Sequence, residues 1–251
     1  MSGHSKWAQI KRAKGANDQK RGQLFTKLGR EVSVAAREGG PSPDGNARLR
    51  MAIDRAREAN MPMETIQRAI QRGVGGGEGA QLEEVVYEGY GAGGAALLIE
   101  ATTDNRNRTV AEVRAALTRA GGSLGEAGSV AWNFESRGVV VCTPGPRGDP
   151  EELALKAVDA GAEEFSVDGT EVELVTDPAR LDEVRRALQA AGARVISAEV
   201  AMVPRTQIEL PVDQTTAVMR LVERLEDLDD VTRVYTNVVI SDEVLAQATA
   251  G

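Results

Sequence analysis

The sequence has few of the residues on which disulfide frameworks, zinc sites and histidine catalysis depend. Its 251 residues include one cysteine, Cys142, and one histidine, His4. A single cysteine excludes a disulfide framework and a cysteine-based zinc site, and a single histidine excludes paired histidine ligands. We therefore predict no metal, no cofactor and no catalytic residues, and we expect Cys142 to be a small buried side chain.

Aromatic residues and long apolar runs are also scarce. Phe, Trp and Tyr make up 3% of the chain, so any hydrophobic core must be built from Val, Leu, Ile and Ala. No stretch approaches the ~20 apolar residues that a membrane span needs. The basic N-terminus is not followed by the apolar segment of a secretory signal. These features predict a cytoplasmic, globular protein without a membrane partner.

The net charge of −8 conceals two regions of opposite sign. Residues 1–30 hold eight basic side chains and one acidic side chain, whereas residues 81–251 hold 15 basic and 30 acidic ones. Residues 31–80 are balanced, with seven of each. We therefore expect the N-terminal segment to attract a polyanion and the rest of the chain not to attract one.

Apolar residues recur at helical spacing in the first part of the chain, which predicts three helices. They span residues 17–37, 46–59 and 62–72. Asp44 is placed to cap the second helix. The glycine-rich residues 73–80 are typical of a flexible linker. Residues 1–80 are therefore predicted to form a basic, all-helical domain that ends in a linker.

Strand and helix patterns alternate through the rest of the chain, so the predicted fold class is α+β. Strands are predicted over residues 95–101, 129–134, 138–143, 164–167, 171–176, 194–203, 207–210 and 231–240, and helices over residues 106–120, 151–160 and 178–191 and after Asp213. Residues 138–203 then have the β-α-β-β-α-β order of a ferredoxin-like domain. The segments on either side of them together give the same order.

The predicted architecture is an N-terminal helical domain followed by two ferredoxin-like (βαββαβ) domains, the third inserted into the second. The helical domain with its linker covers residues 1–80, the discontinuous second domain covers residues 81–135 and 206–251, and the inserted third domain covers residues 136–205. The alternative is a pair of sequential α+β domains that divide at Pro144-Gly145-Pro146.

The strongest chemical signal is the run of basic residues near the N-terminus, in which a tryptophan is embedded. Lysine and arginine release counterions from a phosphate backbone, and an indole ring stacks on bases or anchors a segment. The alternative is a solvated basic helix with Trp7 packed into a core. We favour nucleic-acid binding, with the candidate contact residues Lys6, Trp7, Lys11, Arg12, Lys14, Lys20, Arg21, Lys27 and Arg30.

A glycine-rich segment offers a second candidate contact. Residues 87–94 are predicted to form a loop, in which Tyr87, Gly89, Tyr90 and Gly91 allow stacking and close backbone approach. A plain turn is the alternative. The glycines match G-x-G-x-x-G, but they precede a strand instead of opening a helix, which argues against nucleotide binding.

Arginines also begin the predicted helix over residues 106–120. Arg106 and Arg108 lie beside the free N–H groups of its first turn, which favour phosphate. Capping by Asp104 or Asn105 is the alternative explanation of this segment. The acidic residues at the end of the last predicted helix are interpreted as a solvated helix end; they are Glu223, Glu226, Asp227, Asp229 and Asp230.

Several motifs together are specific to one family. They are Ser2-Gly3-His4-Ser5-Lys6-Trp7, Lys20-Arg21-Gly22, Phe25-Thr26-Lys27-Leu28, Asn60-Met61-Pro62, Tyr87-Glu88-Gly89-Tyr90-Gly91, Thr103-Asp104-Asn105-Arg106-Asn107-Arg108-Thr109 and Gly128-Ser129-Val130-Ala131-Trp132. Because it carries these motifs, the chain resembles the YebC-like family of probable transcriptional regulatory proteins and translational activators of the cytochrome c oxidase subunit type. Ala92 departs from the pattern, since many members carry proline there.

The resemblance implies three domains, the first of them helical, and a non-enzymatic role in gene expression without a small-molecule substrate. It implies a DNA-binding transcriptional regulator, with a ribosome-associated or RNA-associated translational activator that relieves stalled synthesis as the alternative. The acidic bulk of the chain and the lack of helix-turn-helix spacing favour ribosomal RNA over DNA. An enzyme and a protein–protein adaptor are the alternatives from other classes.

Overall fold

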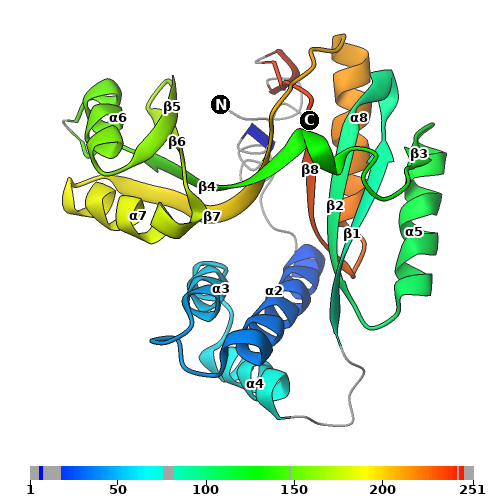
Figure 1. The fold of residues 1–251 in the computed structure, drawn as a ribbon, viewed down its shortest axis with the longest axis horizontal. Coiled ribbons are helices and arrows are strands. Elements are labelled where there is room, and N and C mark those ends of the chain that lie inside the picture. Colours follow the sequence, from blue (N-terminus) through cyan, green and yellow to red (C-terminus); the bar gives the residue numbers. More distant parts are fainter. Residues whose placement is uncertain (1–5, 8–17, 76–81, 147, 242, 246–251) are drawn as a thin grey trace. The chain divides into compact units, whose positions relative to one another are not determined.

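A computed structural model describes most of the chain (Figure 1). The described residues are 6–7, 18–75, 82–146, 148–241 and 243–245. They fall into two compact units, each assembled from segments that are distant in sequence. Among the described residues, one unit draws on residues 14–130 and 213–234, and the other on residues 131–212 and 235–251 together with residues 6 and 7.

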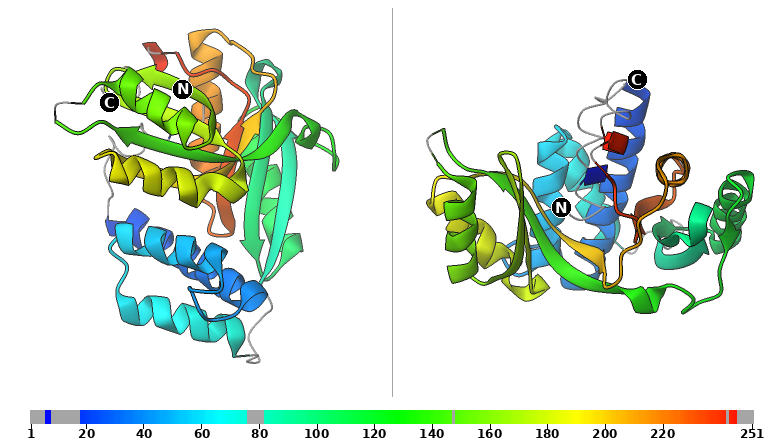
Figure 2. Two further views of the ribbon diagram at one scale, coloured as in Figure 1. Left: turned by 60° about the vertical axis from the view of Figure 1, so that its left-hand side comes forward. Right: turned by 90° about the horizontal axis from the view of Figure 1, so that it is seen from above.

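The N-terminal part of the chain is a bundle of three helices, as the apolar spacing predicts. They are α2 (Asp18–Gly39), α3 (Ala47–Glu58) and α4 (Met63–Val74). Both α3 and α4 pack against α2 (Figure 2). Each helix turns its apolar face inward, and the buried core includes Val32, Ala35, Ala36, Leu49, Ala52, Ala56 and Ile66.

Asn46, and not the predicted Asp44, caps α3. The Asn46 Oδ1 accepts a hydrogen bond from the Leu49 N–H at 3.0 Å. Its Nδ2 donates to the carbonyl oxygens of Ala35 and Gly40 at 2.8 and 2.9 Å. Asn46 therefore closes the start of α3 and the end of α2 together, which an aspartate with no N–H donor cannot do.

Helix α4 continues past its predicted end and includes Gly73 and Val74. A Cβ atom at Gly73 would lie 2.2 Å from the Ser33 carbonyl oxygen of α2. The Ser33 hydroxyl donates to the Ala69 carbonyl at 2.7 Å, which joins the same two helices. Gly73 is thus a close-packing residue of α4, and assigning it to the linker is wrong. Residues 76–80 of the predicted linker lie outside the described residues.

The first sheet has the strand order β3-β1-β2-β8. Its strands are β1 (Glu83–Tyr90), β2 (Ala96–Thr103), β3 (Ser123–Leu124) and β8 (Val231–Thr236), and the helices of this region are α5 (Arg106–Arg119) and α8 (Val212–Glu226). Strands β1 and β2 form an antiparallel hairpin in which Tyr90 lies opposite Ala96. The elements therefore follow the order β-β-α-β and later α-β, so the predicted pair of β-α-β segments is wrong here.

Three predictions of local structure in this region are wrong. Residues 87–90 belong to β1, and only Ala92–Gly94 form a short 3-10 turn before β2. Residues 131–133 form another 3-10 turn instead of a strand, and just before it the Glu88 carboxylate accepts hydrogen bonds from the Gly128 and Val130 N–H groups. Residues 207–210 make only an isolated bridge to the segment after β8.

The second sheet has the strand order β5-β6-β4-β7. Its strands are β4 (Phe134–Thr143), β5 (Ala162–Asp168), β6 (Glu171–Thr176) and β7 (Arg194–Pro204), and its helices are α6 (Pro150–Asp159) and α7 (Leu181–Ala190). These elements follow one another as β-α-β-β-α-β, the order that the sequence predicts for residues 138–203. Cys142 is fully buried in β4, and burial raises the pKa of its thiol to about 11.

Candidate nucleic-acid interface

The predicted N-terminal contact residues are only partly described. Lys11, Arg12 and Lys14 lie outside the described residues, and of Lys20 only the backbone is described. The Trp7 side chain is 4% exposed. This burial fits the alternative, a Trp7 packed into a core, as well as an indole that anchors the segment, and it leaves little ring surface for stacking on a base.

Exposed arginines occur on all three helices of the bundle. Arg21 on α2 holds its guanidinium carbon 5.4 Å from the centre of the Phe25 ring, in a cation–π contact that leaves its N–H groups accessible. Within the described part of the chain, no ion pair engages Arg21, Arg37, Arg57 or Arg72. These four guanidinium groups are therefore available to phosphate without first losing a carboxylate partner.

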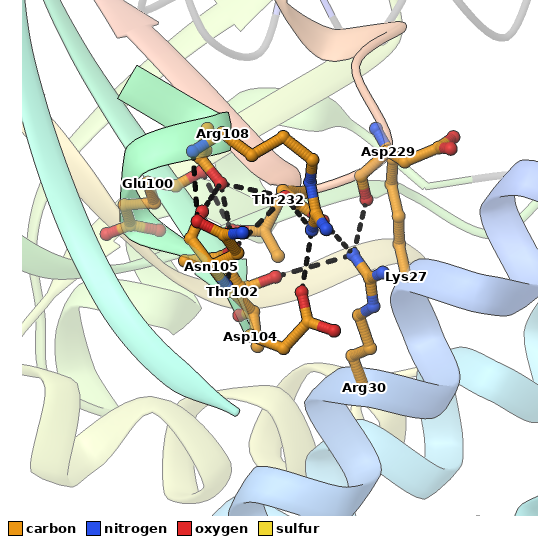
Figure 3. Close-up of polar contacts among 12 residues, drawn as sticks. Lys27, Arg30, Glu100, Thr102, Asp104, Asn105, Arg108, Asp229 and Thr232 are labelled. Atoms are coloured by element: carbon orange, nitrogen blue, oxygen red, sulfur yellow. Dashed lines mark hydrogen bonds and ion pairs between the residues drawn. The ribbon is translucent and has the colours of Figure 1, made fainter. Parts of the chain in front are cut away.

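Two other predicted contact residues, Arg30 and Arg108, converge on the carboxylate of Asp230. The Arg30 Nη1 donates to Asp230 Oδ1 at 2.8 Å, and the Arg108 Nη2 donates to Oδ2 at 2.6 Å. The hydroxyl groups of Thr103 and Thr109 donate to Oδ2 at 3.0 and 2.7 Å. Figure 3 shows the two arginine side chains pointing toward one another, one from α2 and one from α5. Asp230 is only 2% exposed, so this carboxylate is the buried centre of the network.

Helix α2 makes further polar contacts with the end of α8 and the turn into β8. The Arg30 Nη1 also donates to the Asp229 carbonyl at 2.8 Å and to the Thr102 carbonyl at 3.4 Å (Figure 3). One turn earlier on α2, the Lys27 ammonium donates to the Glu226 carbonyl. Lys27 and Arg30 thus attach the helical bundle to the first sheet.

The electrostatics of Asp230 follow from its surroundings. Burial by itself raises the pKa of the Asp230 carboxyl, because a charged carboxylate loses its water. Hydrogen bonds from Arg108, Thr109, Thr103 and Arg30 favour the charged form and hold the pKa below its ordinary value. The hydrogen bond to Asp230 is also the main cause that raises the pKa of Arg108. Asp230 is therefore ionised at neutral pH, and Arg108 stays charged beside it.

Arg106, the remaining predicted phosphate ligand, contacts an exposed carboxylate. Its Nε donates to Glu83 Oε2 of β1 at 2.6 Å. Asn105 caps α5, since its Oδ1 accepts a hydrogen bond from the Arg108 N–H at 3.1 Å. Arg108 also pairs with Asp104 at 2.7 Å. The structure thus brings Arg108 together with Arg30, whereas it places Arg106 against β1.

The predicted loop residues Tyr87, Gly89, Tyr90 and Gly91 lie in or directly after β1. The Tyr87 hydroxyl donates to the Arg106 carbonyl at 3.4 Å, and the Tyr90 hydroxyl donates to the Ser129 carbonyl at 3.0 Å. Residues an odd number of positions apart in a strand face opposite sides of the sheet. The two tyrosine rings therefore do not share one stacking surface.

Two buried carboxylates beside the predicted contact residues, Asp230 and Glu88, are not recognisable from the sequence. The interpretation of Asp230 as part of a solvated helix end is wrong, because its partners come from segments far away in the chain. Glu88 is also buried and binds the Gly128 and Val130 N–H groups, both at 2.6 Å. The one available signal concerns Asp230, which directly precedes a predicted strand, where a lone charge needs a buried partner. Glu88 lies in the predicted loop and has no such signal.

Two further properties concern the described residues only. No group of three or more His, Cys, Asp or Glu side chains among them is arranged to hold a metal ion. None of the helices they form is long and apolar enough to cross a membrane.

Comparison with known proteins relates both parts of the chain to one family. Residues 5–76 match the model of the TACO1/YebC protein N-terminal domain, and residues 82–238 match that of the TACO1/YebC second and third domain. A probable transcriptional regulatory protein of Roseiflexus castenholzii is 53% identical over 255 residues, covering 100% of both chains. A probable transcriptional regulatory protein of Moorella thermoacetica is also 53% identical, and the match covers 98% of this chain and 99% of that relative.

The fold is also similar to a solved structure. A conserved hypothetical protein of Aquifex aeolicus has a crystal structure that superposes with a TM-score of 0.82 at 44% sequence identity. The match covers 91% of this chain and 94% of that chain.

Proposed function

The chain belongs to the TACO1/YebC family, and we propose that it is a non-enzymatic, nucleic-acid-binding regulator of gene expression. The observation that carries the proposal is the segregation of charge. Residues 1–30 hold eight basic side chains against one acidic one. The helical bundle adds four exposed arginines that form no ion pair with any residue that the structure describes. A basic surface of this kind binds phosphate by releasing condensed counterions.

The nucleic-acid contacts in this proposal come mainly from the basic residues of the N-terminal segment. They comprise Lys6, Lys11, Arg12, Lys14, Lys20 and Arg21, extended by Arg37, Arg57 and Arg72. Lys27, Arg30 and Arg108 already bind carbonyl or carboxylate oxygens, so they would have to exchange these partners for phosphate. We therefore assign them first to positioning the helical bundle, and only second to contact with nucleic acid.

We propose duplex DNA as the target, since the relatives are named probable transcriptional regulatory proteins. The alternative is ribosomal RNA, bound in the course of translation. A specific observation favours it: residues 81–251 carry 30 acidic against 15 basic side chains, which duplex flanks would repel. A basic domain on an acidic body suits a folded RNA surface that only the basic domain touches.

The three-domain architecture is part of the same proposal. The boundary between the two family-model matches, at residues 76–82, supports a first domain over residues 1–80. We propose that residues 136–205 form a ferredoxin-like third domain inserted into a second domain over residues 81–135 and 206–251. The antiparallel sheet order β5-β6-β4-β7 supports this.

Binding by the full chain tests the function and separates its two targets. Labelled duplex DNA and structured ribosomal RNA are titrated with wild type and with the combined Lys11→Gln, Arg12→Gln, Lys14→Gln variant. The matched control removes the same charge from the third domain by Lys156→Gln, Arg185→Gln and Arg186→Gln. We expect only the N-terminal variant to bind more weakly.

The preferred nucleic acid of the wild type separates the two targets. Tighter binding to duplex DNA than to RNA supports transcriptional regulation, and tighter binding to RNA supports the alternative. Equal binding by both variants would remove the basis of the proposal.

A further inference from the structure

The third domain exposes apolar side chains on two neighbouring elements. On α6, Leu155 and Val158 are 60% and 42% exposed; on β5, Phe165 and Val167 are 46% and 38% exposed. Single exposed apolar residues are ordinary on protein surfaces, whereas a contiguous group marks an interaction site.

The two β5 side chains face the helix layer of the domain. Phe165 lies opposite Leu174 of β6, which lies opposite Val140 of β4. Gly138 shares the face of Val140, and a Cβ atom there would lie 3.2 Å from Leu181 of α7. Residues on this face of the sheet thus point toward the helices. Val167, two residues after Phe165, points the same way.

The two α6 side chains form a stripe on the β5 side of their helix. Leu155 and Val158 are three residues apart and share a face, adjacent to the buried Ala154 and Ala157. Strands β4 and β5 run parallel, and a crossover between parallel strands is right-handed. Helix α6 therefore runs antiparallel to β4 and β5 on one face of the sheet. Because an α-helix is right-handed, the residues that directly follow the buried Ala154 and Ala157, which are Leu155 and Val158, lie on the side of α6 nearer to β5. The four side chains therefore form one patch, the α6–β5 patch.

The outer edge of β5 adjoins this patch. β5 is the terminal strand in the order β5-β6-β4-β7, and no described strand pairs with its outer side. An exposed strand edge presents backbone N–H and C=O groups that accept another extended segment. The patch thus combines apolar side chains with a row of backbone hydrogen-bonding groups.

Acidic residues surround the α6–β5 patch. Residues 149–171 include eight acidic side chains and one basic side chain, Lys156, which is paired with Glu152 at 2.9 Å. Two arginines from other segments also reach this region, since Arg137 pairs with Glu163 at 2.6 Å and Arg180 donates to the Ala160 carbonyl at 3.0 Å. The acidic side chains remain in excess. This density of negative charge repels nucleic acid. It also disfavours a second copy of the chain, because pairing β5 with β5 would bring the two acidic segments together. A basic partner is attracted instead.

We propose that the α6–β5 patch is a docking surface for an extended, basic segment of a partner protein. The segment adds to the outer edge of β5 as a further strand. Its alternate side chains cover Leu155, Val158, Phe165 and Val167, and its lysines and arginines pair with the surrounding carboxylates. The patch shares no residue with the proposed nucleic-acid contacts, so the two proposals can fail independently.

A designed peptide tests the proposal on the full chain. The probe is a labelled peptide in which lysine and valine alternate, and its control has the same composition with the lysines and valines in separate blocks. The combined Leu155→Gln, Phe165→Thr variant is compared with Met63→Gln, Val200→Thr, which alters exposed apolar residues elsewhere. We expect the alternating peptide to bind wild type, and its dissociation constant to rise about tenfold or more only in the first variant.

Each other outcome overturns the proposal. If the block peptide binds as tightly as the alternating peptide, or if the Leu155→Gln, Phe165→Thr variant binds the alternating peptide like wild type, charge attraction alone explains the binding. Self-association in sedimentation that this variant abolishes would assign the patch to a second copy. If the variant does not fold, the surface exchange Glu164→Lys with Asp168→Lys replaces it, and failure of this exchange to weaken binding refutes the proposal.

Discussion

The Arg30 guanidinium lies 2.8 Å from the Asp230 carboxylate, although 200 residues separate them in the chain. Arg108 binds the other oxygen of the same carboxylate at 2.6 Å. One buried acid thus joins α2 to α5 and to the start of β8. On α2, Arg30 is therefore turned toward this acid, whereas Arg21 is exposed to solvent.

The first prediction concerns Asp230→Asn. The amide leaves two arginines without their shared counter-charge, and breaking a buried ion pair on one side costs about 3 kcal/mol. We expect the melting temperature of the full chain to fall by roughly 6–12 °C. The neighbouring Asp229→Asn is the matched control, since the exposed Asp229 uses its main-chain carbonyl and not its carboxylate. Equal melting of both variants would contradict a stabilising role for the network.

The second prediction is the pH dependence of that difference. The folded-state pKa of Asp230 is lowered, so its contribution to stability is present above the unfolded-state pKa and is lost as pH falls through the folded-state value. The stability gap between wild type and Asp230→Asn should be full above about pH 5 and should shrink below about pH 4. Thermal melts across this range measure it, and a gap that persists unchanged in strong acid would rule out the ion pairs as its source.

The third prediction concerns Gly73→Ala. An added Cβ atom would lie 2.2 Å from the Ser33 carbonyl oxygen, so α4 must shift from α2 at a cost of about 1–3 kcal/mol. Gly22→Ala is the control, since nothing lies within 4 Å of a Cβ atom there. In that exposed helix position alanine should stabilise by about 0.5–1 kcal/mol. Chemical denaturation followed by circular dichroism compares the two, and destabilisation of equal size in both would refute the packing argument.

The fourth prediction separates binding from structure at Arg106. Its partner Glu83 is exposed, so Arg106→Gln should change stability little. If Arg106 contacts phosphate, Arg106→Gln weakens nucleic-acid binding, whereas Glu83→Gln leaves it unchanged or strengthens it by freeing the arginine. Fluorescence anisotropy on the full chain distinguishes the two variants. If Arg106→Gln binds nucleic acid like wild type, Arg106 does not contact phosphate, and its role is limited to the ion pair with Glu83 of β1.

The three helices of the bundle were predictable because each has a periodic apolar face and clear end signals. The elements of residues 138–203 were predictable for a similar reason, since short apolar strands alternate there with amphipathic helices. Cys142 was correctly expected to be buried, because it lies within an apolar strand. In these cases local pattern and tertiary packing agree.

Other features depend on contacts between distant segments and had no local signal. Strand β1 was missed because its glycines and charged residues weaken the strand pattern, while its pairing with β2 along eight residues stabilises it. The cap of α3 was assigned to Asp44 because the second role of Asn46, at the end of α2, is not visible in sequence. In the sequence Asp230 looks like an ordinary acidic residue at a helix end, because its partners Arg30 and Arg108 come from distant segments.

The salt dependence of nucleic-acid binding by the full chain tests the central claim most directly. If about five of the eight basic side chains in residues 1–30 reach phosphates, the logarithm of the binding constant should fall with the logarithm of salt concentration with a slope of roughly −4 to −5. In the Lys11→Gln, Arg12→Gln, Lys14→Gln variant the slope should become shallower by about three. An affinity that does not change with salt, or an equal slope in wild type and variant, would contradict nucleic-acid recognition by the N-terminal basic domain.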